Sequence, residues 1–139
     1  MSRVINPDGS GKERSRLSRE IVKAIRELMS QTEPNETTRD LAAFITSALF
    51  QIYETVDVSV NAWEKRGYWV KADRFRMEWE WSMYYGKDMK EALLKEDWVM
   101  IAMISAKVAQ KFPSVKIGPK NRIGEPWHGA WKKFKEKQV

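Results

Sequence analysis

The sequence predicts an all-α fold, namely a four-helix bundle with a central, fully buried fourth helix and a short C-terminal fifth helix. Apolar residues recur at helical spacing along most of the chain, and glycine or proline separates the periodic segments. Residues 98–109 read WVMIAMISAKVA, and Ser105 is the only polar residue from 98 to 106. A helix that is apolar all round must be buried, and this one is shorter than the ~20 residues that cross a bilayer.

The length of 139 residues is typical of one domain. We expect an N-terminal arm over residues 1–10, a helical bundle over 11–111 and a basic, aromatic C-terminal arm over 112–139. The absence of cysteine excludes disulfides, thiolate nucleophiles and cysteine-ligated zinc. The first residues contain no apolar run of the kind that a secretory signal needs, so the expected location is the cytoplasm. No cofactor is expected.

The first helix is predicted over residues 11–31, and the second over 35–66. Ser10 and Glu13 fit a capping box at the start of the first, and Asn35 or Thr37 suits the N-cap of the second. Residues 55–60 alternate apolar with polar, so a β-hairpin over 55–70 is the alternative. We favour a helix that ends at Gly67, because the helical spacing of apolar residues continues through this region.

The third helix is predicted over residues 68–85 and the central helix over 89–111. Gly86 is expected to end the third helix, and Asp88 with Glu91 to form a second capping box. Pro113 is expected to stop the central helix, because a residue before proline is pushed out of helical geometry.

The last helix is expected to begin near Pro126, which suits a first helical turn. Trp127, Trp131 and Phe134 follow at i, i+4 and i+7, between several lysines. Such a helix folds back on the bundle, docks on a second subunit, enters a partner's groove or lies on a membrane surface. Docking on the bundle or on a second subunit is the interpretation that we favour.

The net charge of +6 is concentrated at the two ends of the chain. Residues 1–30 carry +3 and residues 112–139 carry +5, whereas the middle is close to neutral. Basic side chains next to aromatic ones are typical of proteins that bind single-stranded nucleic acid. The residues predicted to contact nucleic acid form a stripe on the first helix and a patch around Trp69, and they are Arg16, Arg19, Lys23, Arg26, Arg66, Trp69, Arg74 and Arg76.

The leading functional prediction is a non-enzymatic binding or assembly protein, and the first alternative is an accessory protein that binds nucleic acid. The high tryptophan content of residues 63–81 predicts partner contacts, because aromatic anchors are enriched at interfaces. The predicted partners are a second copy of the chain or another protein, through Trp81, Trp127, Trp131 and Phe134.

A metal-dependent phosphohydrolase is the second alternative. Glu54, Asp57 and Glu64 lie on one side of the second helix, and clustered carboxylates suit Mg²⁺ or Mn²⁺. Helical nucleotide pyrophosphohydrolases use helices lined in this way, but their paired ExxE and ExxD motifs are absent here. These three carboxylates also lie opposite the apolar side of the second helix, which favours a solvent-exposed role. No catalytic or metal-binding residue is therefore assigned.

Two stretches of the chain, SRVINPDGSGKERSRLSR over 2–19 and AWEKRGYWVKADRFRMEWEW over 62–81, resemble an uncharacterised group of small bacterial helical proteins. The resemblance implies an all-α fold and no particular activity, substrate or site.

Overall fold

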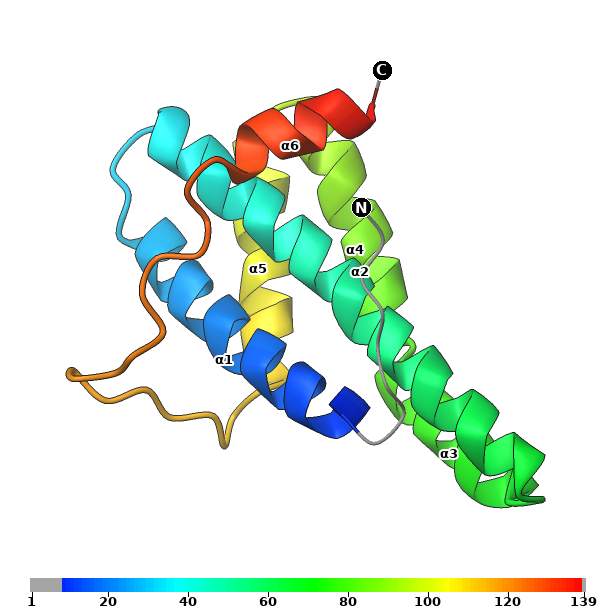
Figure 1. Cartoon of the computed structure of the whole chain (residues 1–139). Helices are drawn as coiled ribbons and strands as arrows, with labels where there is room; N and C mark the ends of the chain where they lie inside the picture. Colours follow the sequence, from blue (N-terminus) through cyan, green and yellow to red (C-terminus); the bar gives the residue numbers. More distant parts are fainter. Residues whose placement is uncertain (1–8, 139) are drawn as a thin grey trace.

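The structure is a computed structural model that describes residues 9–138, and within that range it is all-helical, without a β-strand (Figure 1). This confirms that the fold is all-α, as predicted. Most of the predicted N-terminal arm lies outside the described residues. The described chain forms six helices rather than five, namely α1 (Ser10–Met29), α2 (Glu36–Lys65), α3 (Trp69–Trp79), α4 (Trp81–Leu94), α5 (Trp98–Gln110) and α6 (Ala130–Lys137).

The central element is α2, not the apolar segment that the sequence singled out. It packs against α1, α3, α4 and α6, and Figure 1 shows it running diagonally through the molecule. Its length of 30 residues corresponds to about 45 Å, long enough for several helices to pack along it. Leu41, Ile45, Leu49, Ile52 and Val56 are fully buried. Although α2 is long and apolar enough to span a membrane, these core contacts are those of a helix buried within a globular fold.

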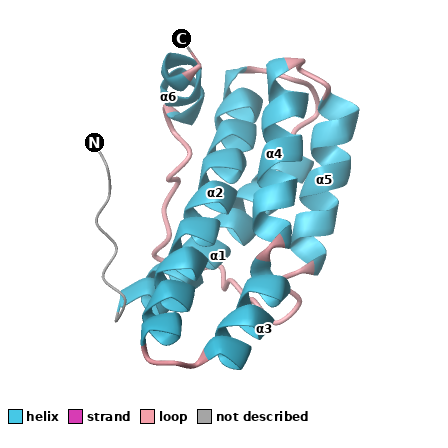
Figure 2. Ribbon diagram, turned by 90° about the vertical axis from the view of Figure 1, so that its right-hand side faces the viewer, coloured by secondary structure: helices cyan, strands magenta, loops and turns pink. Residues whose placement is uncertain are grey.

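The prediction that residues 89–111 form a fully buried helix is wrong. Ile101, Ile104 and Val108 of α5 are buried, but Val99 is 73% and Met103 is 51% exposed. α5 packs mainly against α4 and α1, and Figure 2 shows it at the edge of the molecule. Although α5 is almost uniformly apolar, one side of the helix is buried in the core and the other side lies at the surface.

The predicted helix boundary at Gly86 is also wrong, because Gly86 lies inside α4. A Cβ atom there would lie 3.1 Å from Cε1 of Phe50, so glycine permits a close approach of α4 to α2. The chain instead breaks after Leu94. Glu96 has a positive φ of 49°, and the Asp97 side chain caps α5 by accepting a hydrogen bond from Met100 N.

The end of α2 follows the prediction. The helix continues to Lys65, so residues 55–65 are not part of a β-hairpin. Gly67 follows with a φ of +82°, and its N–H donates to the Glu64 carbonyl while the Tyr68 N–H donates to the Trp63 carbonyl. This pair of bonds is the Schellman arrangement, which needs a left-handed residue at the position of Gly67.

Neither predicted capping box is present. The box expected of Asp88 and Glu91 cannot form, because both residues lie inside α4. The predicted N-cap of α2 is Asn35, and it forms a capping box with Thr38. Asn35 accepts a hydrogen bond from Thr38 N, and the Thr38 hydroxyl accepts one from Asn35 N. The predicted box of Ser10 and Glu13 is absent: the Ser10 hydroxyl instead lies 2.7 Å from the Ser59 hydroxyl on α2. A tertiary hydrogen bond has replaced the local one.

The C-terminal helix folds back onto α2 of the same chain, which answers the question of where it docks (Figure 1). It begins at Ala130 rather than near Pro126. Its N-terminus is capped from α2, since Asp40 accepts hydrogen bonds from Gly129 N at 3.2 Å and from Trp131 N at 2.9 Å. A cap that lies about 90 residues away in sequence explains why local signals misplaced the start of α6.

Candidate nucleic-acid interface

The candidate site lies between α1 and the segment that connects α5 to α6, residues 111–129, here called the α5–α6 loop. α1 buries Leu17, Ile21 and Ile25 against the core, so the opposite side of the helix carries its charged residues. Figure 1 shows the α5–α6 loop running beside α1.

The C-terminal half of the basic stripe on α1 holds this loop in place. Lys23 Nζ donates to the Gly124 carbonyl at 2.6 Å and to Asn121 Oδ1 at 3.2 Å. Arg26 Nη1 makes a longer contact of 3.5 Å with the Ile117 carbonyl. Lys23 and Arg26, both predicted to contact nucleic acid, therefore position the loop.

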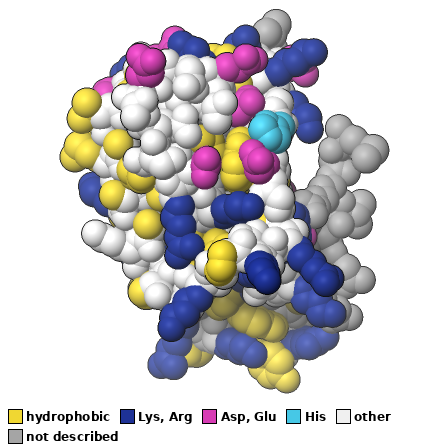
Figure 3. All heavy atoms as spheres, turned by 90° about the vertical axis from the view of Figure 1, so that its left-hand side faces the viewer, with side chains coloured by type: hydrophobic (Ala, Val, Ile, Leu, Met, Phe, Trp, Pro, Cys, Tyr) yellow, Lys and Arg dark blue, Asp and Glu magenta, His cyan; other side chains and the backbone are white. Residues whose placement is uncertain are grey.

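The N-terminal half of the stripe faces an open cavity of about 1050 Å³, here called the basic groove. α1 contributes Lys12, Arg16 and Arg19 to its wall, and the loop contributes Lys120 and Arg122 from the other side. Figure 3 shows Lys and Arg side chains gathered over the lower part of this face of the molecule. Basic residues from α1 and from the α5–α6 loop are thus brought together in space, whereas the lysines of α6 lie elsewhere, on a helix that packs against α2.

The five cations of the basic groove differ in how much of their charge is already neutralised. Arg16 binds both Glu13 and Glu20, with Nε–Oε2 and Nη1–Oε1 distances of 3.3 and 2.8 Å. The hydrogen bond to Glu13, aided by Glu20, raises the pKa of Arg16. No ion pair or hydrogen bond within residues 9–138 involves the side chains of Lys12, Arg19, Lys120 and Arg122. These four are available to an anionic ligand.

A second cavity of about 500 Å³, here called the aromatic groove, lies next to the basic groove and shares Ser15 and Arg19 with it. The basic residues in its wall are Arg14, Arg19, Lys111 and Lys116, and the aromatic ones are Trp79 and Phe112. The Arg14 guanidinium lies 4.7 Å from the centre of the Phe75 ring and 5.7 Å from that of Trp79. Burial lowers the pKa of Arg14, but an arginine remains charged in a protein.

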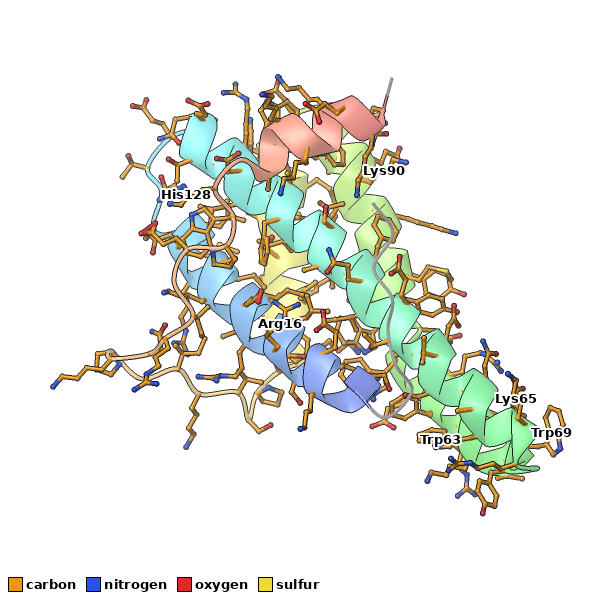
Figure 4. All side chains as sticks on the ribbon, in the orientation of Figure 1. Arg16, Trp63, Lys65, Trp69, Lys90 and His128 are labelled. Carbon is orange, nitrogen blue, oxygen red and sulfur yellow. The ribbon has the colours of Figure 1, made fainter. Side chains whose placement is uncertain are left out.

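The other predicted nucleic-acid residues lie elsewhere, at the α2–α3 turn and along α3. Trp69 there is 59% exposed, and Figure 4 shows it with Trp63 and Lys65 at the tip of the molecule, far from Arg16. Arg76 lies 3.3 Å from Asp73 and 3.7 Å from Glu64, whereas Arg66 and Arg74 are exposed. The structure therefore divides the predicted residues between two separate surfaces.

The aromatic residues predicted to bind a partner mostly belong to the core. Trp127 is 1% and Phe134 is 5% exposed, and Trp131 stacks on Phe134 with ring centres 5.8 Å apart. Trp81 stacks on Trp79 at 5.7 Å and meets the edge of Phe112. These contacts attach α6 and the α5–α6 loop to the helices, so these side chains do not form an exposed docking surface.

The carboxylates Glu54, Asp57 and Glu64 lie along α2 as the sequence predicted. Partial burial raises the pKa of Asp57, and the nearby Arg76 opposes that rise. Glu64 is paired with Arg76. Within residues 9–138 the structure contains no group of three or more His, Cys, Asp or Glu side chains placed to hold a metal ion.

Sequence reasoning missed Lys120, Arg122 and Asn121. The excess of positive charge after residue 112 indicated a basic tail, but no local pattern indicated that the loop would lie against α1. A comparison of the chain with protein-family models, curated proteins and solved structures finds no match.

Proposed function

We propose that the protein is a non-enzymatic accessory protein that binds single-stranded nucleic acid in the basic and aromatic grooves. In this proposal α1, α2, α4 and α5 form a four-helix bundle that supports the two grooves. The observation that carries the proposal is the convergence of Lys12 and Arg19 with Lys120 and Arg122 around one open cavity.

The chemistry of the two grooves supports a nucleic acid over a small anion. Cations line two adjoining cavities, a distribution that suits a chain of phosphates better than one isolated phosphate. Trp79, which is partly exposed in the wall of the aromatic groove, provides apolar ring surface for a base, whereas Phe112 is only 7% exposed. Bases are free to stack on protein side chains only where they are not paired, which favours single strands.

Binding of labelled single-stranded and duplex DNA and RNA, measured by fluorescence anisotropy, tests the proposal. Four phosphate contacts predict about a 50-fold loss of affinity for single strands between about 50 and 200 mM salt. The double variant Arg19→Glu/Lys120→Glu should abolish binding. The matched control is Lys90→Glu, because Lys90 is exposed on α4 and lies away from α1 (Figure 4).

A protein partner that binds at the α2–α3 turn is the second candidate. The exposure of Tyr68, Trp69 and Val70 favours it, since apolar side chains gathered at a tip suit docking. The anisotropy assay also shows which of the two surfaces binds nucleic acid. If Trp69→Ala and Arg74→Glu abolish nucleic-acid binding while Arg19→Glu/Lys120→Glu leaves it intact, the proposal for the two grooves is refuted.

A further inference from the structure

The hairpin of α2 and α3 ends in an exposed segment, residues 65–74, here called the hairpin tip. α3 packs on α2 through Val56, Val60 and Ala72, a small core that is separate from the main one. Figure 1 shows the hairpin extending beyond the lower end of α1, and Figure 4 shows Lys65 and Trp69 at its end. A flat surface can therefore reach the hairpin tip without meeting the other described helices.

Three consecutive residues at the start of α3 expose apolar side chains. Tyr68, Trp69 and Val70 are 54%, 59% and 66% exposed. Helical side chains tilt toward the N-terminus of their helix, so those of Trp69 and Val70, in the first turn of α3, extend toward the end of the hairpin. Trp and Tyr are enriched where a bilayer meets water, because each combines an apolar ring with a polar group.

Four exposed cations flank these apolar residues in the sequence, and they are Lys65, Arg66, Lys71 and Arg74. None of the four forms an ion pair or a side-chain hydrogen bond with any residue in the described range 9–138. The two carboxylates within residues 64–74 belong to Glu64 and Asp73, and both lie near Arg76 instead, at 3.7 and 3.3 Å. The positive charge of the hairpin tip is therefore not neutralised within the fold.

We propose that the hairpin tip docks on an anionic membrane surface, where Trp69 and Val70 enter the headgroup region and the four cations bind anionic headgroups. Charge complementarity identifies the surface, because polybasic segments bind anionic lipids. The same cations count against the protein partner considered above, since lysine and other charged residues are depleted at the centres of protein interfaces. This inference does not depend on nucleic-acid binding in the basic and aromatic grooves, which do not include residues 65–74.

The composition of the hairpin tip predicts a weak, reversible and salt-dependent attachment. Each Lys or Arg close to an anionic membrane strengthens binding about fivefold. The attraction extends over one Debye length, which is only about 3 Å at 1 M salt, so salt at that concentration should release most of the protein.

Co-sedimentation with vesicles of phosphatidylcholine, or of an equal mixture of phosphatidylcholine and phosphatidylserine, tests the proposal. The wild type should bind only the anionic vesicles, and Arg66→Glu/Arg74→Glu should weaken this binding by more than about tenfold. Lys87→Glu/Lys90→Glu is the matched control, because it changes the net charge equally through exposed residues of α4, and it should retain vesicle binding. Arg19→Glu/Lys120→Glu should also retain it. If this groove variant loses vesicle binding while Arg66→Glu/Arg74→Glu keeps it, the proposal is refuted.

An environment-sensitive dye tests whether the hairpin tip enters the bilayer, and the natural chain contains no cysteine to interfere. Val70→Cys labelled with nitrobenzoxadiazole should gain fluorescence on the anionic vesicles. Val99→Cys is the matched control and should not respond, since Val99 is similarly exposed but lies on α5. A response at Val99→Cys without one at Val70→Cys would contradict docking through the hairpin tip. A wild type that binds neither kind of vesicle overturns the proposal in favour of a protein partner.

Discussion

The Lys23 ammonium lies 2.6 Å from the carbonyl oxygen of Gly124, and this contact joins α1 to the α5–α6 loop. It places Lys120 and Arg122 opposite the basic side of α1. Asn121 strengthens the arrangement, because its side chain accepts from Lys23 and from Ile123 N and donates to the Gly118 carbonyl. One lysine thus connects the two basic ends of the chain without itself occupying the groove.

Lys23→Met should loosen the loop while leaving every cation that lines the basic groove in place. We expect faster hydrogen exchange of the amides in residues 117–124 and a several-fold weaker affinity for single strands. Lys12→Met is the matched control, because it removes a groove cation that makes no contact with the loop. It should weaken binding and reduce its salt dependence by about 0.7 in the log–log slope, with no change in amide exchange. Equal exchange rates in the two variants would disprove the positioning role of Lys23.

Asp40→Ala should detach the start of α6, because the Asp40 carboxylate accepts hydrogen bonds from Gly129 N and Trp131 N. The loss of such a cap costs about 1 kcal/mol, up to about 2. Urea unfolding followed by tryptophan fluorescence measures this cost and also reports on the buried Trp127. Asp88→Ala on the exposed surface of α4 is the control and should unfold like the wild type. A cost below about 0.3 kcal/mol for Asp40→Ala would mean that apolar packing alone holds α6.

Gly67→Ala should destabilise the protein by about 1 kcal/mol, because Gly67 has a φ of +82° and alanine is strained there. A Cβ at this position would meet no atom within 4 Å, so the cost comes from the backbone alone. Gly11→Ala is the control, since Gly11 lies in the first turn of α1 with equally open surroundings. It should be neutral or stabilising in denaturant unfolding. Equal effects of the two substitutions would contradict the strain argument.

Those parts of the fold that depend on local chemistry were predictable from the sequence. Asn35 caps α2 and Gly67 follows its end, because each acts through backbone groups a few residues away. The apolar stripe of α1 identified its buried side. The uniformly apolar α5 gave no such information, because its burial depends on how many helices surround it. Likewise, Gly86 allows Phe50 of α2 to lie close to α4, and no local sequence pattern reveals this contact.

The candidate site was only half predictable for the same reason. Helical spacing placed Arg16 and Arg19 on one side of α1, and the structure places both in the wall of the basic groove. Lys120 and Arg122 reach that groove through contacts such as that of Lys23 with the loop about 100 residues further along the chain. Contacts between segments so far apart depend on packing, which the spacing of residues in one segment does not report.

Asp57→Asn should make the protein slightly more stable at neutral pH, and the effect is small because Asp57 is itself exposed and solvent screens its charge. Partial burial raises the pKa of Asp57 in the folded state, so the folded protein binds this proton more tightly than the unfolded chain does. The contribution of the Asp57 carboxyl to the free energy of unfolding is therefore greatest at low pH, where the group is protonated in both the folded and the unfolded protein. This contribution is lost as the pH rises from below about 4 through the raised pKa of the folded state. Denaturant unfolding at several pH values should show the variant and the wild type equal near pH 3 and the variant more stable at pH 7.

Glu54→Gln is the matched control, because Glu54 is exposed on the neighbouring turn of α2, and it should unfold like the wild type at both pH values. The same pair of variants also tests the phosphohydrolase alternative. A carboxylate that binds Mg²⁺ or Mn²⁺ would give the wild type a metal-dependent rise in melting temperature that Asp57→Asn lacks. With no such rise, a stabilising Asp57→Asn indicates that Asp57 is a charge that Arg76 only partly compensates, and α2 then has no role in metal chemistry.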